Sequence, residues 1–195
     1  QYFSICDHSK SAFYAGGLSE ESVVRQHQEI DRLNAELHPF RIFKGIESDI
    51  LSDGSLDYSN DVLSTFDLVV ASIHSGLSMD QSRATERLIK AIENPYTTIL
   101  GHPTGRLLLS RQGYPVDHQK IIDACYANGV SVELNAHPYR LDLDWRWIAY
   151  AMEKGVYVSI NPDAHHIDGI SMMKYGVNVA RKAGLTSEGT LDRKS

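Results

Sequence analysis

Short runs of β-forming residues alternate with longer helical patterns along most of this 195-residue chain. The clearest run, residues 69–73, is apolar at nearly every position, as expected for a strand that is covered on both faces. The pattern predicts strands over 2–6, 41–47, 67–73, 98–101, 130–135 and 156–161. It predicts helices over 20–37, 79–93, 117–128, 144–154 and 171–182. This alternation indicates an α/β fold built around a parallel sheet.

Several predicted helices carry clear signals at their ends. Ser19 is placed to cap the helix over 20–37. Gly129 and Gly155 directly follow two other helices, where a left-handed residue commonly ends a helix. No Pro-rich or Gly-rich linker divides the chain, and its length suits one buried core. Residues 1–195 are therefore expected to form one domain.

Composition limits the kinds of partner that this chain can have. Nineteen Lys and Arg against 25 Asp and Glu give a net charge of −6, which disfavours a protein whose whole surface binds nucleic acid. Cys6 and Cys125 lie far apart and form no CxxC pair, so a reducing, cytoplasmic setting is expected. No apolar run approaches the roughly 20 residues that span a bilayer, so no membrane partner is expected.

Potential metal ligands stand at the ends of the predicted strands. In a parallel barrel, the loops after these ends converge on one mouth. Imidazole and carboxylate ligands without thiolate suit zinc, manganese or iron. The strand-end residues are Asp7, His8, Glu47, Asp49, His74, His102, Glu133, Asn135, Asp163 and His165. We interpret this pattern as a multinuclear metal site for the hydrolysis of phosphate esters.

A single histidine at a strand end is more often a hydrogen-bonded turn residue than a metal ligand. The joint pattern favours ligands, because structural histidines would have no reason to follow strand ends. By the same criterion, His27, His38 and His118 are interpreted as structural or surface residues. His137 and His166 adjoin the ligand segments and are candidates for a supporting role.

Two basic residues follow predicted ligands closely. Arg106 lies four residues after His102 and could bind a substrate phosphate through two hydrogen bonds. Lys10, two residues after His8, could also contact substrate. An ordinary surface salt bridge is the alternative for both side chains. The chain contains no GxSxG, no phosphate-loop glycine pattern and no GxGxxG, which leaves metal-assisted hydrolysis as the chemistry.

Six separated motifs occur in an order that resembles the polymerase-and-histidinol-phosphatase (PHP) family. They are Cys-Asp-His-Ser, Gly-Ile-Glu-Ser-Asp-Ile, Ala-Ser-Ile-His-Ser, Leu-Gly-His-Pro-Thr-Gly-Arg, Glu-Leu-Asn-Ala and Asn-Pro-Asp-Ala-His. Together they span nearly the whole chain. Within the family, Asp-His-Ser-Lys-Ser and His-Pro-Thr-Gly-Arg look most like the domain fused behind bacterial X-family DNA polymerases.

The resemblance implies a distorted (β/α)7 TIM-like barrel that holds up to three divalent ions at the strand ends. Carried over by position, Glu47 would bridge two ions, and His74 and His102 would complete one of them. Asp163 would serve another, and His8 and His165 would share the third. Glu47, Asp163 and His165 are the residues expected to act in catalysis, while Asn135, Arg106 and Lys10 are expected to contact substrate.

The chain departs from the family pattern at its start. The family opens with a strand that ends in His-x-His, and this motif is absent here. The six βα units are therefore expected to form a barrel with an open seam and unpaired strand edges. Because Gln1 to Cys6 reads as a strand already under way, an N-terminally truncated chain is the expectation.

The implied function is 3′-5′ exonuclease or 3′-end processing of DNA, beside an upstream polymerase domain in the parent protein. Two alternatives stay open. One is a small-molecule phosphatase of the histidinol-phosphatase type, which the acidic net charge mildly favours. The other is a non-catalytic scaffold for the polymerase, which the missing His-x-His motif supports.

Overall fold

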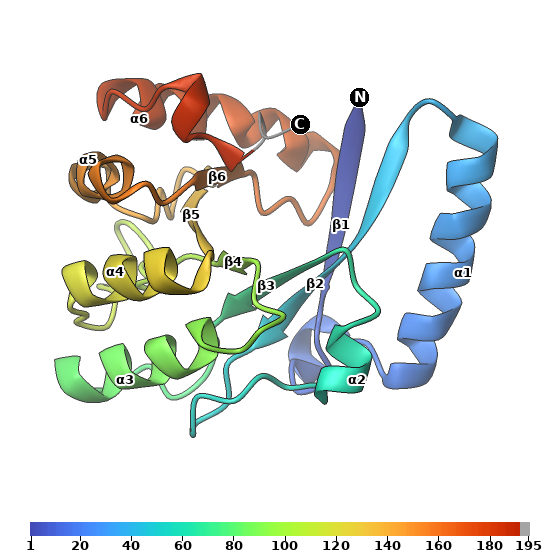
Figure 1. Cartoon of the computed structure of the whole chain (residues 1–195), viewed down its shortest axis with the longest axis horizontal. Helices are drawn as coiled ribbons and strands as arrows, with labels where there is room; N and C mark the ends of the chain where they lie inside the picture. The colour runs from blue at the N-terminus through green and yellow to red at the C-terminus, as the bar shows by residue number, and fades with distance from the viewer. Residues whose placement is uncertain (192–195) are drawn as a thin grey trace.

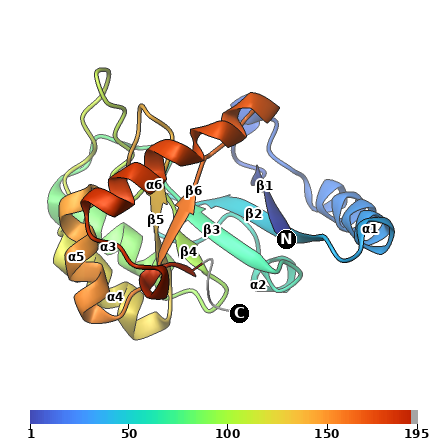
Figure 2. The same cartoon turned by 90° about the horizontal axis from the view of Figure 1, so that it is seen from above.

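The computed structural model describes residues 1–191, in which six parallel strands form one curled, open sheet (Figures 1 and 2). Their order in the sheet is their order in the chain. The strands are β1 (Tyr2–His8), β2 (Arg41–Asp49), β3 (Leu68–Ser72), β4 (Ile99–Leu100), β5 (Ser131–Asn135) and β6 (Val158–Asn161). The predicted α/β fold with six strands is confirmed. The sheet curls into a half-barrel and does not close into a full barrel.

Helices cover the convex side of the sheet. They are α1 (Glu20–Leu37), α2 (Asn60–Leu63), α3 (Gln81–Ile92), α4 (His118–Asn128), α5 (Trp145–Lys154) and α6 (Met173–Lys182). In Figures 1 and 2, α3 to α6 stack side by side along one flank, while α1 stands apart beside β1 and β2. Among residues 1–191, none of the helices combines the length and apolar content needed to cross a membrane.

Side chains alternate along the strands between an apolar face and a polar face. Val132 and Leu134 of β5 are fully buried in the main apolar cluster, together with side chains from the helices. Glu133 and Asn135 alternate with them and face the concave side with Glu47 and Asp49 of β2. The curled sheet thus separates an apolar core from a polar concave surface, and this surface carries the predicted site.

Glycine permits the tight curl at two places. A Cβ on Gly101 would lie 2.3 Å from the Ser72 hydroxyl oxygen, and one on Gly45 would lie 2.4 Å from the Cys6 sulfur. Both separations are far below contact distance, so a larger residue at either position would displace side chains of the neighbouring strand, and at position 45 it would also meet the Ile5 carbonyl at 2.7 Å.

The predicted helix ends are confirmed. The Ser19 hydroxyl accepts a hydrogen bond from the Ser22 N–H, and Gly129 and Gly155 end α4 and α5 with φ of 68° and 80°. Sequence patterns missed the one-turn helix α2, which is too short to show periodicity. They also made β4 too long, since only Ile99 and Leu100 pair with their neighbours.

Strands β1 and β6 form the two edges of the sheet in the described part of the chain. Val158 of β6 makes a parallel bridge with Thr190, which covers part of that edge. Tyr2 and Phe3 of β1 remain 51% and 40% exposed at the other edge. The open seam expected from the sequence therefore lies between these two strands.

Gly176 provides a test of how closely α6 packs on the sheet. A Cβ at this position would lie 2.5 Å from the Ala136 Cβ and 2.7 Å from a methyl carbon of Ile160. Alanine normally stabilises a helix by about 1 kcal/mol relative to glycine. We expect G176A instead to lower the free energy of unfolding by about 1–3 kcal/mol, because it overpacks the core. Urea denaturation measures this change.

The exposed Asn178 in the same helix supplies the control. N178A should leave stability unchanged or raise it by a few tenths of a kcal/mol. Equal stabilisation by G176A and N178A would show that α6 does not pack as closely as described.

Candidate metal centre

The carboxylate of Glu47 lies at the centre of a buried cluster of histidines. Its Oε1 atom lies 2.9 Å from Nε2 of His102 and 3.3 Å from Nε2 of His74. Its other oxygen, Oε2, lies 3.3 Å from Nδ1 of His8. The end of β1, the end of β2 and the loops after β3 and β4 supply these four side chains. Strands that are far apart in sequence thus bring four predicted ligands together.

Electrostatics hold Glu47 ionised in this cluster. Burial opposes its ionisation, but the hydrogen bonds and charges of His102 and His74 hold the pKa of the carboxyl well below its usual range. Burial likewise disfavours the charged form of His74, yet its contacts with Asp49 and Glu47 raise its pKa to about 9. The pKa of His102 is also raised, because its hydrogen bond to Glu47 outweighs burial.

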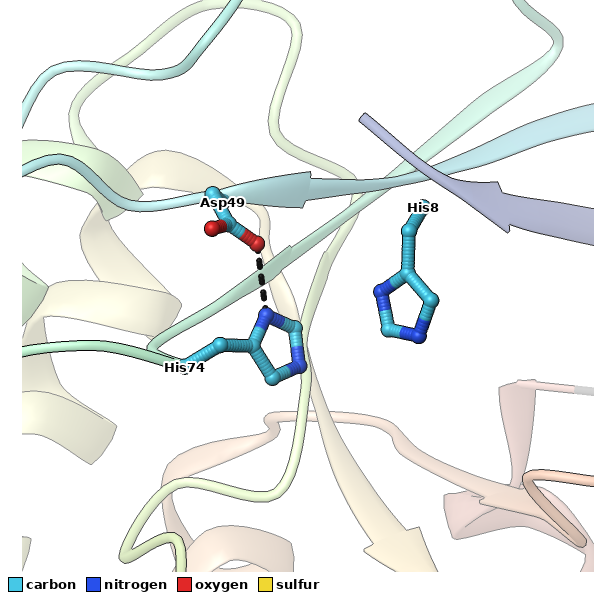
Figure 3. Close-up of side chains that lie close together, drawn as sticks. All are labelled: His8, Asp49 and His74. Carbon is cyan, nitrogen blue, oxygen red and sulfur yellow. Dashed lines mark hydrogen bonds and ion pairs between the residues drawn. The ribbon is translucent and has the colours of Figure 1, made fainter. Parts of the chain in front are cut away.

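Asp49 orients the His74 ring. Figure 3 shows the Asp49 carboxylate beside this ring, and the ring of His8 lies nearby with its centroid 5.0 Å from that of His74. Asp49 Oδ1 lies 2.6 Å from Nδ1 of His74, and Oδ2 accepts a hydrogen bond from the Ser11 hydroxyl at 3.1 Å. A carboxylate on one ring nitrogen directs the other nitrogen toward a metal. Here it directs Nε2 of His74 toward Glu47.

The cluster has the spacing and chemistry of a metal site. Two ligand atoms on one tetrahedral zinc ion stand about 3.4 Å apart, given bonds of about 2.1 Å. The contacts of Glu47 with His74 and His8 match this separation. Nδ1 of His8 is buried without a hydrogen-bond partner, since its approach to Glu47 is close but poorly aligned. These residues fit a divalent ion, and the two Glu47 oxygens face different histidines.

Within residues 1–191, two groups bring at least three possible ligand atoms within 4.8 Å of one another. One group is His8, Asp49 and His74, and the other is Glu47, His74 and His102. Asp163 and His165, which were also predicted as ligands, belong to neither group.

Asp163 and His165 nevertheless lie at the same mouth. The ring centroid of His165 is 6.0 Å from that of His8, and its side chain is 63% exposed. The Asp163 carboxylate accepts a hydrogen bond from the Asn135 amide at 3.1 Å and lies 3.3 Å from Nε of Arg140. Asp163 has a φ of 51°, a left-handed conformation that is uncommon for residues other than glycine. Their metal-binding role stays a prediction.

Glu133 joins several residues of the polar face through hydrogen bonds. It accepts hydrogen bonds from the His102 backbone N–H at 2.7 Å and from the Asn161 amide at 2.9 Å. Burial raises its pKa to about 7, the nearby His102 opposes this rise, and Asp163 adds to it. Glu133 therefore positions the loop that carries His102.

Arg106 and Lys10, which were predicted to contact substrate, form salt bridges with other residues, as the alternative interpretation expected. Arg106 donates to the Asp144 carboxylate at 2.8 Å and to the carbonyls of Arg140 and Leu141. Lys10 lies 3.1 Å from Glu20. Contact with substrate would require both side chains to exchange these bonds, so that role stays a prediction.

Sequence reasoning treated Asp49 only as one of the strand-end candidates and gave no function to Arg140, and the structure places both at the site. The sequence did indicate that Asp49 would lie near Glu47, because it stands two residues later and therefore on the same face of β2. Arg140 lies five residues beyond the end of β5, in a loop whose path carries no sequence signal.

Comparison with known proteins adds to this geometry. No protein-family model matches the chain. DNA polymerase/3′-5′ exonuclease PolX of Bacillus subtilis is 44% identical over all 195 residues. The chain is homologous to PolX. It spans 34% of the PolX sequence, so PolX is a much longer protein.

Phosphatases form a second group of similar proteins. A probable phosphatase of Thermoanaerobacter sp. is 30% identical over 166 residues, covering 80% of this chain and 65% of that protein. One of Caldanaerobacter subterraneus is 32% identical over 134 residues, covering 64% of this chain and 50% of that protein.

A solved structure shares the fold. Histidinol phosphate phosphatase from Lactococcus lactis, crystallised with zinc, L-histidinol and phosphate, superposes with a TM-score of 0.66 over 95% of this chain and 83% of its own. At 15% identity, this likeness concerns the fold alone.

The raised pKa of His74 predicts a pH-dependent stability for the metal-free protein. A histidine with a folded-state pKa of about 9 and an unfolded value of about 6.5 stabilises the fold fully below pH 6.5. This contribution is lost as the pH rises to 9. In EDTA, we expect the free energy of unfolding to fall by up to about 3 kcal/mol across this range. Denaturant unfolding at each pH measures it.

Asp49→Asn removes the carboxylate that contributes most to this shift, so its profile between pH 6.5 and 9 should be flatter. Asp61→Asn, at the exposed start of α2, is the control and should keep the wild-type slope. Parallel profiles for wild type and D49N would contradict the assignment.

Proposed function

We propose that this chain is a metal-dependent phosphoesterase of the PHP type that hydrolyses 3′ ends of DNA, in a parent protein that also carries a polymerase region. The observation that carries the proposal is Glu47, whose two oxygens face His8 on one side and His74 with His102 on the other. The identity of 44% with PolX over the whole chain supports the choice of DNA ends as substrate.

Glu47, His8, His74 and His102 would hold zinc, manganese or iron, with Asp163 and His165 completing a site for up to three ions. When bound, such ions supply acidified water as a nucleophile and offset negative charge on the phosphate. The buried ligands of this chain hold their own orientation through Asp49 and Glu133. The site is therefore largely organised before substrate arrives.

Arg140 is the cation best placed to attract substrate. Its guanidinium lies beside Asp163 at the mouth, and the Arg140 side chain is 18% exposed. An arginine can bind two phosphate oxygens at once through its planar donors. Arg140 would thus orient the phosphate against the metal cluster, while Asn135 holds Asp163 through its amide group.

A second candidate function is the hydrolysis of a small phosphate monoester. Its support is the similarity to probable phosphatases and the fold shared with a histidinol phosphate phosphatase. The same metal chemistry would serve both substrates, so substrate preference and not metal content separates the two functions.

Glu47→Gln tests the metal centre. Removing one charge from a ligand that faces three histidines should lower bound manganese below half of the wild-type content. It should slow hydrolysis of a DNA oligonucleotide at its 3′ end by at least about 100-fold, since changes behind the first ligand layer already cost about 10–100-fold. Elemental analysis and a gel assay measure the two quantities.

Glu93→Gln, at the exposed end of α3, is the matched control and should leave both quantities unchanged. Hydrolysis of histidinol phosphate alone, with no cleavage of DNA, would replace the proposed substrate with the second candidate. Less than one ion per wild-type chain, with no chelator-sensitive hydrolysis, would leave a scaffold as the remaining function.

A further inference from the structure

Large apolar side chains are highly exposed in the segments that follow several strand ends. The four most exposed in the described chain are Leu109 at 102%, Phe13 and Ile167 at 87%, and Tyr14 at 74%. Phe13, Tyr14 and Ile167 lie in short 3-10 helices after β1 and β6, and Leu109 lies in the loop after β4. Apolar residues gathered beside a functional site commonly mark a surface that contacts a ligand.

The leucines of the loop after β4 lie in a hydrogen-bonded hairpin. Leu107 and Arg111 exchange backbone hydrogen bonds of 2.9 and 2.8 Å, which close a small hairpin. Leu109, at its tip, has a φ of 66°, a costly conformation for a leucine. The hairpin thus holds this side chain in solvent at an energetic cost, instead of burying it.

A backbone hydrogen bond joins the hairpin to the loop after β5. The Leu108 N–H donates to the Tyr139 carbonyl, and the Tyr139 side chain is 59% exposed. Leu108, Leu109 and Tyr139 therefore form one surface, which we call the apolar wall.

The apolar wall and two of the predicted ligands line the same pocket. This pocket has a volume of about 430 Å³ and is also lined by Arg140, Asp163 and His165. Pockets of about 300–1,000 Å³ accept small ligands. The pocket thus brings an aromatic ring and aliphatic side chains together with a guanidinium and two predicted metal ligands.

We propose that the apolar wall binds the terminal base of a single-stranded nucleic acid, while the adjoining phosphate lies at Arg140 and the metal centre. This inference rests on the proposed function and adds that the apolar wall selects substrates that end in a base. Every base has a flat π-face that stacks on an aromatic ring, and such stacking is independent of sequence. A small phosphate monoester without a ring would leave the Tyr139 ring without a stacking partner.

The test compares two oligonucleotides that differ only in the last base. One is a short oligothymidylate, and the other has an abasic sugar at its 3′ end. Both carry a 5′ fluorophore and a terminal phosphorothioate linkage that slows hydrolysis. Fluorescence anisotropy with manganese gives the two dissociation constants. For wild type, we expect the oligonucleotide with the base to bind at least about fivefold more tightly.

Tyr139→Ala should abolish this preference and leave binding of the abasic end unchanged. Tyr139→Phe should retain the preference, because the ring remains. Tyr126→Ala is the matched control, since Tyr126 is 63% exposed on α4, away from the pocket. Circular dichroism and manganese content should be equal for all four proteins.

Other outcomes overturn the inference. An unchanged preference in Y139A, or an equal loss of affinity for both ends, would show that the wall does not bind a base. Concentration-dependent dimerisation that Y139A abolishes, with base preference intact, would assign the wall to a second copy of the chain. Cleavage of DNA by wild type without base preference overturns the inference alone. Failure of wild type to bind or cleave either end overturns the proposed function as well.

Discussion

The buried carboxylate of Glu47 constrains the geometry of four strand ends. A carboxylate on a side chain that is only 12% exposed is costly unless cations or strong hydrogen-bond donors surround it. His8, His74 and His102 meet this need from β1 and from the loops after β3 and β4. These loops must converge on β2, and the curl of the sheet allows them to do so. The histidine cluster around Glu47 and the curvature of the sheet therefore depend on each other.

One face of the sheet contributes to stability, and the other face carries the residues of the candidate site. Residues such as Val132 and Leu134 pack with the helices and contribute apolar burial. Their sequence neighbours Glu133 and Asn135 point to the concave side and join the hydrogen-bond network around His102 and Asp163. Because neighbouring residues in a strand serve opposite faces, a shift of register by one residue would destroy core and site together.

The sequence predicted the strands and most helices closely, because their alternation and caps are local signals. It also predicted that His8, Glu47, His74 and His102 would meet, since parallel strands end on one side of a sheet. The pairing of Asp49 with His74 and of Arg140 with Asp163 could not be read in the same way. These contacts depend on side-chain direction and on the path of long loops, which local patterns do not encode.

Arg106 joins two loops that come from different strands. Its guanidinium bonds to Asp144 and to the carbonyls of Arg140 and Leu141, and the Leu108 N–H adds a second tie between the same loops. The two segments therefore form one mechanical unit above the sheet. For protein engineering, these two segments have to be treated as one unit. A change of substrate preference would require the exchange of residues 106–111 and 139–144 together, whereas transplanting either loop alone would separate Arg106 from the backbone that it holds.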